Sequence, residues 1–319
     1  MYGYTSKHNL NELHSVAWKL ACRNLEDRKV ILSKSRDRID TQLIMANLRR
    51  SGICSIVTIE ESEQIKKIST TVSSLITQKK AIAPIKRPKT EKTIHYTTGS
   101  HNYYSDEEVQ DSNFQIQNSA SLVSIQNPFI SIPTLADITF SETMLSLACA
   151  YFGVPPILSY AKITHSFAND LPEFDTQMWH VDYGAKFILK FIIYLNDVDQ
   201  GTGPFAYVKG SHQKKFRGWN LKTRFSEKEL RQHYTEDAFY SATGRLGTIH
   251  IAETTGFHKG TKPLDNARTV LIFNYTLHPE VGFPWNRIKF SKDTYNKMTE
   301  VQKIFFSDQI FEIVDNELE

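Results

Sequence analysis

The spacing of apolar residues changes along the chain, from a helical period in the first part to short β-type runs in the second. In the first part, apolar side chains recur every three or four residues, which predicts amphipathic helices. These helices cover residues 13–21, 41–50 and 60–76, and a fourth covers 141–152. Between the second and third, the β-branched run 53–59 predicts a short strand. The N-terminal region is therefore expected to be largely helical.

From residue 157 onward, short β segments alternate with turn residues. The segments cover 157–167, 177–182, 186–195, 204–208, 247–252 and 268–277. Strands at this spacing without intervening helices predict an antiparallel barrel or sandwich. The charged segment 213–244 is expected to be an excursion between two strands. Residues 79–120 carry little periodicity and are expected to form a long cover loop.

Composition narrows the class of protein without naming a function. The chain has 319 residues, of which 40% are hydrophobic, and a formal net charge of +3, which is typical of a globular protein without the basic stripe that nucleic-acid binding requires. The sequence contains no apolar stretch of about 18 residues, so we expect neither a membrane span nor a secretion signal. We therefore expect a cytoplasmic location. The three cysteines lie far apart, which argues against a disulfide framework or a zinc ribbon.

Two segments carry candidate chemistry. His180 and Asp182 are two residues apart, so on a strand they project from the same face and can offer a nitrogen and a carboxylate oxygen to one point. One such pair is a weak signal, but His258 follows in a glycine-flanked turn, and Arg268 opens the next predicted strand. Two histidines and one carboxylate form the facial triad of non-haem Fe(II) oxygenases. An arginine aimed at the same cavity can hold a carboxylate through two parallel hydrogen bonds.

The order of these motifs resembles a known family. The motifs are the H-x-D pair, the glycine-bearing turn 196–204, the Lys-Gly-Ser-His segment 209–212, the Phe-His-Lys-Gly segment 257–260 and Arg268. In this order they are similar to the phytanoyl-CoA dioxygenase family of Fe(II)/2-oxoglutarate-dependent oxygenases, and the resemblance spans about residues 48–277.

The resemblance implies a mostly β fold with flanking helices (α+β), built on a double-stranded β-helix, or jelly roll. The catalytic core would cover 157–279, with the excursion 213–244. An N-terminal helical region with the cover loop, 1–156, would pack on it. The tail 280–319 is expected to be helical, and the whole chain is expected to act as one functional domain.

The resemblance also implies the site and the reaction. Iron would be held by His180, Asp182 and His258, and the cosubstrate 2-oxoglutarate would pair with Arg268. With molecular oxygen (O2) as second cosubstrate, the family oxidises small molecules or carrier-bound metabolites and releases succinate and CO2. Halogenating members carry a small residue at the position of Asp182, so the carboxylate here favours hydroxylation. The motifs do not distinguish hydroxylation from desaturation, ring closure or demethylation.

Several assignments stay open at this point. If the inward face continues through the strand 186–195, Lys190 lies on it with Ile192 and Tyr194, and it can meet a 2-oxoglutarate carboxylate or an acidic group of the substrate, or else be exposed. Lys162, on the preceding strand, has the same alternatives. A protein hydroxylase of the same fold, or a non-catalytic module that binds 2-oxoglutarate, are the alternative functions. The substrate-binding residues are unassigned.

Overall fold

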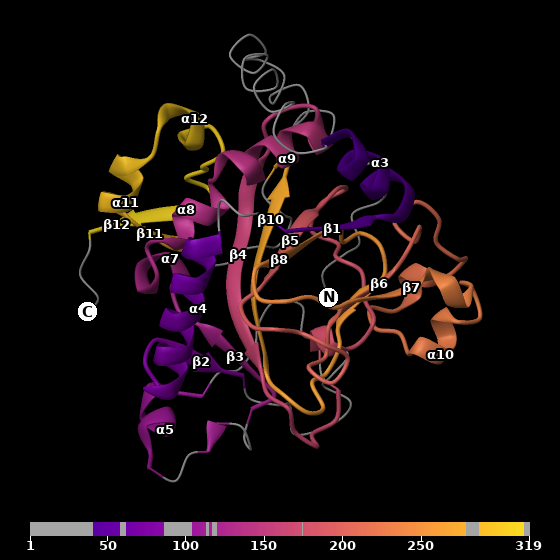
Figure 1. Ribbon diagram of the computed structural model, residues 1–319, viewed down its shortest axis with the longest axis horizontal. Helices are drawn as coiled ribbons and strands as arrows, with labels where there is room; N and C mark the ends of the chain where they lie inside the picture. The colour runs from indigo at the N-terminus through magenta and orange to yellow at the C-terminus, as the bar shows by residue number, and fades with distance from the viewer. Residues whose placement is uncertain are drawn as a thin grey trace.

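Two antiparallel sheets form the centre of the molecule (Figure 1). The computed structural model describes residues 41–57, 62–85, 104–112, 115–116, 120–173, 175–278 and 287–315. The helix expected over 13–21 and much of the cover loop lie outside these residues. Within the described part of the chain, every helix is too short or too polar to cross a membrane.

The larger sheet has seven strands, and each neighbouring pair is antiparallel. In spatial order the strands are β1 (Ile53–Val57), β8 (Thr248–Glu253), β5 (Leu189–Tyr194), β10 (Arg268–Thr276), β4 (Ile157–Ser166), β3 (Leu122–Ile125) and β2 (Ile82–Pro84). Only the four central strands come from the predicted core. The N-terminal region, which was expected to be largely helical, adds three strands. The strand predicted over 53–59 is β1 at one edge, and β3 and β2, which the pattern did not predict, lie at the other edge. These additions cover backbone groups that an open edge would expose.

The smaller sheet contains β7 (Phe239–Ala242), β6 (Phe205–Val208) and β9 (His258–Gly260) in that order. Trp179 and His180 extend it through two isolated bridges, to Phe225 and to His258. The strand expected over 177–182 is therefore reduced to these two residues. The preceding η3 (Asp175–Gln177) is a 3₁₀ turn that begins at Asp175 with a φ of +48°, a conformation incompatible with an extended strand.

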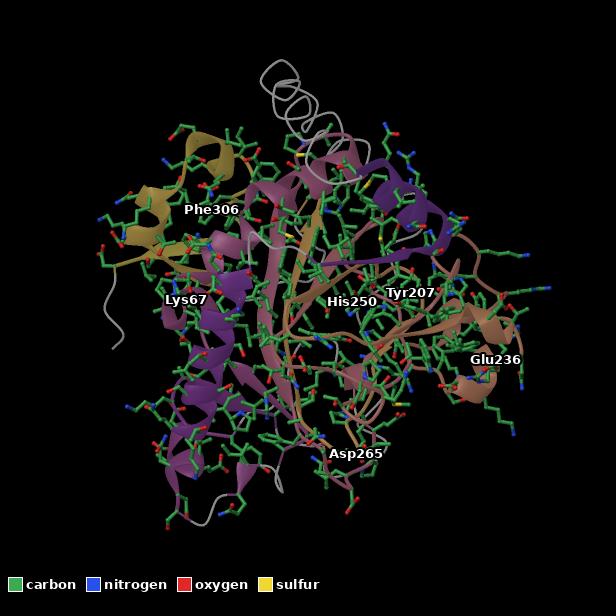
Figure 2. All side chains as sticks on the ribbon, viewed as in Figure 1. Lys67, Tyr207, Glu236, His250, Asp265 and Phe306 are labelled. Atoms are coloured by element: carbon green, nitrogen blue, oxygen red, sulfur yellow. The ribbon has the colours of Figure 1, made fainter. Side chains whose placement is uncertain are left out.

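The two faces of the larger sheet pack against different partners. On β10, Leu271 and Phe273 point into the main hydrophobic core, whereas Val270 points into the space between the two sheets. His250 and Tyr207 lie in the middle of the molecule in Figure 2, and Tyr207 belongs to the smaller cluster between the sheets. This alternation follows from the two-residue period of a strand and confirms the predicted mostly β architecture with flanking helices.

Helices cover the outer face of the larger sheet and supply the other half of the main core. They are α3 (Thr41–Ser51), α4 (Ser62–Thr77), α5 (Asp106–Gln110), α7 (Pro128–Ser131), α8 (Leu135–Thr139) and α9 (Glu142–Phe152). The helices predicted over 41–50, 60–76 and 141–152 correspond to α3, α4 and α9. Gly153 ends α9 with a φ of +72°, a left-handed conformation that glycine adopts without strain.

Two segments differ from simple helices or loops. The excursion 213–244 contains η4 (Trp219–Leu221), α10 (Glu227–Leu230), η5 (Glu236–Ala238) and then β7, a strand of the smaller sheet. The tail, expected to be helical, holds α11 (Lys292–Lys297) and α12 (Glu300–Lys303) but also β11 (Ile288–Ser291) paired in parallel with β12 (Phe311–Val314). Phe290 and Phe311 of this pair pack on Phe129 of α7, and this long-range burial favours strands there.

Candidate metal centre and its cavity

His180 and His258 are brought together by the smaller sheet. Each backbone N–H donates to the carbonyl oxygen of the other residue at 2.9 Å, which makes the two residues direct partners in an antiparallel bridge. Side chains of directly opposed residues leave a sheet on the same face. The two imidazole rings are accordingly 4.2 Å apart between centroids, and both residues are buried.

The hydrogen bonds of the two imidazoles define which nitrogen is free to bind a ligand. His180 Nδ1 lies 2.8 Å from the Met178 carbonyl oxygen, and His258 Nδ1 lies 2.9 Å from that of Gly256. Because a carbonyl oxygen only accepts, each Nδ1 carries the proton and each Nε2 presents a lone pair. Among the described residues, His258 Nε2 is buried without a hydrogen-bond partner. This is the arrangement of imidazoles prepared to bind a metal.

Asp182 completes the cluster. Its Oδ1 lies 3.9 Å from His180 Nε2, and its Oδ2 lies 3.7 Å from His258 Nε2. One ligand atom from each of the three residues lies within 4.8 Å of the other two. The Asp182 backbone N–H donates to the Thr254 carbonyl at 2.9 Å, which anchors the residue to the turn before β9. Two nitrogens and one oxygen on one side of a point are the donor set that suits Fe(II).

The electrostatics of the cluster favour the protonation states that a metal requires. Burial lowers the pKa of His258 to about 4, although the Asp182 carboxylate opposes this shift. Burial alone would raise the pKa of the Asp182 carboxyl, but Lys190 and the two imidazoles hold it well below its ordinary value. Lys190 Nζ donates to Asp182 Oδ2 at 2.6 Å. Neutral imidazoles and an ionised carboxylate are the forms that bind metals.

A cavity of about 150 Å³ opens beside the cluster and extends between the sheets. Arg268 lies in its wall and is only 5% exposed. One guanidinium nitrogen donates to the Thr261 carbonyl at 2.8 Å, which orients the planar group. Gly260 lines the same wall, and a Cβ there would lie 2.8 Å from the Arg268 guanidinium. The glycine therefore makes room for the arginine.

The two lysines considered from sequence also line this cavity. Lys190 and Ile192 share the inner face of β5, as the strand alternation predicts. Lys162 projects from β4, and burial lowers the pKa of its ammonium group, which the negative charge of Asp175 partly offsets. Strand alternation on β10 places Arg268, Val270, Ile272 and Asn274 on one face. The first three line the cavity, whereas Asn274 is buried but is not part of the cavity wall.

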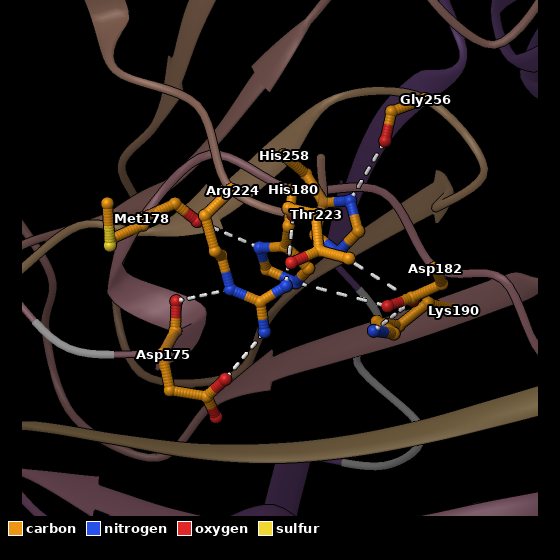
Figure 3. A network of polar contacts seen from close by, with 9 residues as sticks. All are labelled: Asp175, Met178, His180, Asp182, Lys190, Thr223, Arg224, Gly256 and His258. Atoms are coloured by element: carbon orange, nitrogen blue, oxygen red, sulfur yellow. Dashed lines mark hydrogen bonds and ion pairs between the residues drawn. The ribbon is translucent and has the colours of Figure 1, made fainter. Parts of the chain in front are cut away.

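The structure adds a pair that sequence reasoning missed. Figure 3 shows Arg224, from the excursion, beside His180, with its guanidinium bonded to Asp175. Its Nη2 donates to the Asp175 carboxylate at 2.6 Å and its Nε to the Asp175 carbonyl at 3.1 Å. The positive charge of Arg224 contributes to the lowered pKa of His180, after burial and His258. The pair holds the left-handed turn that precedes His180. Arg224 and Asp175 are 49 residues apart, so no pattern of neighbouring residues in the sequence indicates that they pair.

Three other residues that could supply metal ligands, His212, His250 and Glu253, lie outside the cluster. His212 Nε2 donates to the Arg49 carbonyl, and His250 bonds Ser55 at 2.7 Å. The Glu253 carboxylate accepts hydrogen bonds from Tyr151 and Thr255. Each of these three side chains therefore has hydrogen-bond partners outside the cluster.

Comparison with known structures establishes the fold. No family model and no curated protein sequence matches the chain. The non-haem α-ketoglutarate-dependent epimerase SnoN from nogalamycin biosynthesis matches 77% of this chain and 92% of its own, with 13% identity and a TM-score of 0.54. The α-ketoglutarate-dependent carbocyclase SnoK matches 76% of this chain and 85% of its own, with 13% identity and a TM-score of 0.52. EctD from S. alaskensis matches 76% of this chain and 80% of its own, with 14% identity and a TM-score of 0.50. The chain shares the jelly-roll fold of these proteins.

Proposed function

We propose that this chain is an Fe(II)- and 2-oxoglutarate-dependent dioxygenase of the phytanoyl-CoA dioxygenase family, which hydroxylates a small molecule or a carrier-bound metabolite. The observation that carries the proposal is the convergence of two imidazole nitrogens and one carboxylate beside a cavity that also contains the buried Arg268. SnoN and SnoK, which share the fold, are themselves non-haem α-ketoglutarate-dependent enzymes. This agreement supports the assignment of the cofactor and cosubstrate.

The residues of the cluster fit Fe(II) by their chemistry. His180 and His258 would each bind the metal through Nε2, because Nδ1 of each donates to a backbone carbonyl, and Asp182 would bind through one carboxylate oxygen. Bound Fe(II), together with 2-oxoglutarate and O2, would supply the oxidising chemistry, with release of succinate and CO2. Such a triad leaves coordination positions open for the cosubstrates.

The remaining residues bind and orient. Arg268 is proposed to hold the distal carboxylate of 2-oxoglutarate, since a buried guanidinium forms strong paired hydrogen bonds with a carboxylate. Lys190 and Lys162 are candidates for contact with the cosubstrate or with the substrate. Asp182 favours hydroxylation over halogenation because its carboxylate occupies the position that a halide would need. A cytoplasmic location and the absence of nucleic-acid and membrane partners stay predictions.

Anaerobic titration with Fe(II) and then 2-oxoglutarate tests the proposal. The folded wild-type protein should develop the weak visible charge-transfer band of an Fe(II)–2-oxoglutarate complex. His180→Ala should abolish the band, whereas His233→Ala, which removes an exposed imidazole, should retain it. A folded wild-type protein without the band contradicts the proposal.

Admission of oxygen then separates the alternatives. Succinate formation, even without substrate, identifies an enzyme, whereas a stable band without turnover of 2-oxoglutarate identifies a binding module. Stimulation of succinate release by peptides rather than by metabolites would favour a protein hydroxylase.

A further inference from the structure

The cavity beside the candidate metal centre holds more positive than negative charge. Among the described residues, the charged side chains of its wall are Lys162, Asp175, Lys190 and Arg268. Two further charges touch these: Asp182 is bonded to Lys190, and Arg224 is bonded to Asp175. Four cations therefore face two carboxylates, an excess of two positive charges in a largely buried space.

Loading the site as proposed does not remove this excess. Fe(II) brings two positive charges and 2-oxoglutarate brings two negative ones, so together they leave the balance unchanged. An uncompensated charge in a site of low dielectric constant is costly. Once iron and cosubstrate are accounted for, the substrate is the remaining component that can neutralise the cavity.

The strand register places Lys162 and Lys190 away from Arg268, the residue proposed to bind the cosubstrate. On β10, Asn274 pairs with Lys190 of β5 and Ile272 pairs with Lys162 of β4, whereas Arg268 lies six residues along β10 from Asn274. At about 3.3 Å per residue, Lys190 is about 20 Å from the level of Arg268. The cosubstrate anchor and Lys190 thus lie toward opposite ends of the cavity, with Lys162 between them.

Lys162 and Lys190 can reach a common point. Their strands flank β10, and their backbone positions are separated by two strand spacings and two residues along the strands, which corresponds to about 12 Å. A lysine side chain extends on the order of 6 Å from its Cα. Both ammonium groups can therefore approach one anionic group held between them.

Of the two lysines, Lys162 has the greater need of a partner. Lys190 is already bonded to Asp182, but that carboxylate would also serve the metal, so its one negative charge is shared. The carboxylate whose charge acts on Lys162 is Asp175, which is itself paired with Arg224. Within the described residues, no carboxylate lies within ion-pair distance of the Lys162 ammonium group.

We propose, building on the proposed dioxygenase function, that the substrate is an anion whose carboxylate or phosphate group binds between Lys162 and Lys190. The acidic group anchors the substrate beside the metal cluster, and the part to be oxidised extends from this anchor. The two lysines then act as residues that determine specificity for acidic substrates.

A pair of matched probes tests the proposal by binding rather than by activity. The wild-type protein is loaded anaerobically with Fe(II) and 2-oxoglutarate, loading is verified by the visible band, and benzoate or benzamide is titrated in by calorimetry. The two probes have nearly the same size and shape, and they differ in charge. We expect benzoate to bind at least tenfold more tightly than benzamide. Inorganic phosphate serves as a second, smaller anionic probe.

Variants assign the effect to the two lysines. Lys162→Met and Lys190→Met should each weaken binding of the anion at least tenfold, and Lys162→Arg should restore part of it. Lys186→Met, which removes an exposed lysine near the site, should leave the affinity unchanged. Since Lys190 also contacts a candidate metal ligand, Lys162→Met is the decisive variant if the other fails to load.

The outcomes separate this inference from the proposed function. Equal affinity for benzoate and benzamide, or failure of both anions to bind the loaded protein, overturns the inference while the dioxygenase assignment stands. Competition between the anion and 2-oxoglutarate also overturns it, because the lysines would then serve the cosubstrate. A wild-type protein that never develops the visible band refutes the proposed function, and the inference falls with it.

Discussion

Replacement of His250 by glutamine should flatten the acid side of the stability curve. His250 lies on β8 between the two sheets, is fully buried and bonds Ser55 through Nδ1 at 2.7 Å (Figure 2). Its Nε2 is buried without a partner among the described residues. Burial therefore lowers the pKa of His250 to about 4, from an ordinary value of 6.5, because a second N–H proton would have no acceptor.

The sign and size of the effect follow from proton linkage. Between these two pKa values the unfolded chain binds a proton that the folded chain rejects, so the free energy of unfolding falls as the pH is lowered. For a shift from 6.5 to about 4, this loss amounts to about 2 kcal/mol between pH 7 and pH 5. The contribution is fully present above pH 6.5 and is lost progressively toward pH 4.

Urea unfolding at pH 7, 6 and 5 measures the effect, with the free energy of unfolding plotted against pH for each variant. His250→Gln removes the titrating group, so its curve should lose about 2 kcal/mol less than wild type between pH 7 and pH 5. His233→Gln, at an exposed position, controls for removal of a histidine as such. A His250→Gln curve parallel to that of wild type would refute the reasoning, whatever its absolute height.

Three further substitutions test other parts of the structure. Gly260→Ala places a Cβ 2.8 Å from the Arg268 guanidinium, which must then move. Calorimetry should show at least tenfold weaker binding of 2-oxoglutarate, with the affinity for Fe(II) retained. An unchanged affinity for 2-oxoglutarate would argue against the proposed role of Arg268. Phe273→Ala empties a buried position stacked on Phe191 and should lower the free energy of unfolding by about 3–5 kcal/mol in urea, whereas a loss below about 1 kcal/mol would contradict the packing. Arg224→Gln removes the guanidinium that pairs with the buried Asp175 carboxylate. Thermal or urea unfolding should show a loss of about 3 kcal/mol in the free energy of unfolding, with no loss if the pair is dispensable.

The local sequence pattern was sufficient to predict side-chain direction within a single strand. The two-residue period of strands predicted that Lys190 and Ile192 share the inner face of β5, and both line the cavity. The same period brought His180 and Asp182 to one side, although 177–182 forms only a pair of bridges rather than a full strand. Side-chain direction depends on local backbone conformation, and an extended segment retains it without a complete hydrogen-bond ladder.

Long-range contacts decided the features that the pattern missed. The strands β1 and β3 pair with β8 and β4, which lie far away in the sequence, and β2 pairs with β3. The N-terminal region alone therefore could not show that it completes the large sheet. The parallel pairing of β11 with β12 likewise depends on burial against α7. Edge strands are short, and their stability comes from the sheet they join rather than from their own residues.

For the candidate site, the sequence alone determined which residue types are present, and its two-residue spacing predicted that His180 and Asp182 lie on one face. His258 and Arg268 were assigned through the family resemblance. Only the tertiary structure decided that His258 lies opposite His180, that Lys190 bonds Asp182, and that Arg224 holds the turn before His180. The physical reason is the difference in sequence separation between the interacting residues. Strand alternation is encoded by neighbouring residues, whereas the charge balance of a cavity is a sum over side chains that meet only when the sheets close on each other.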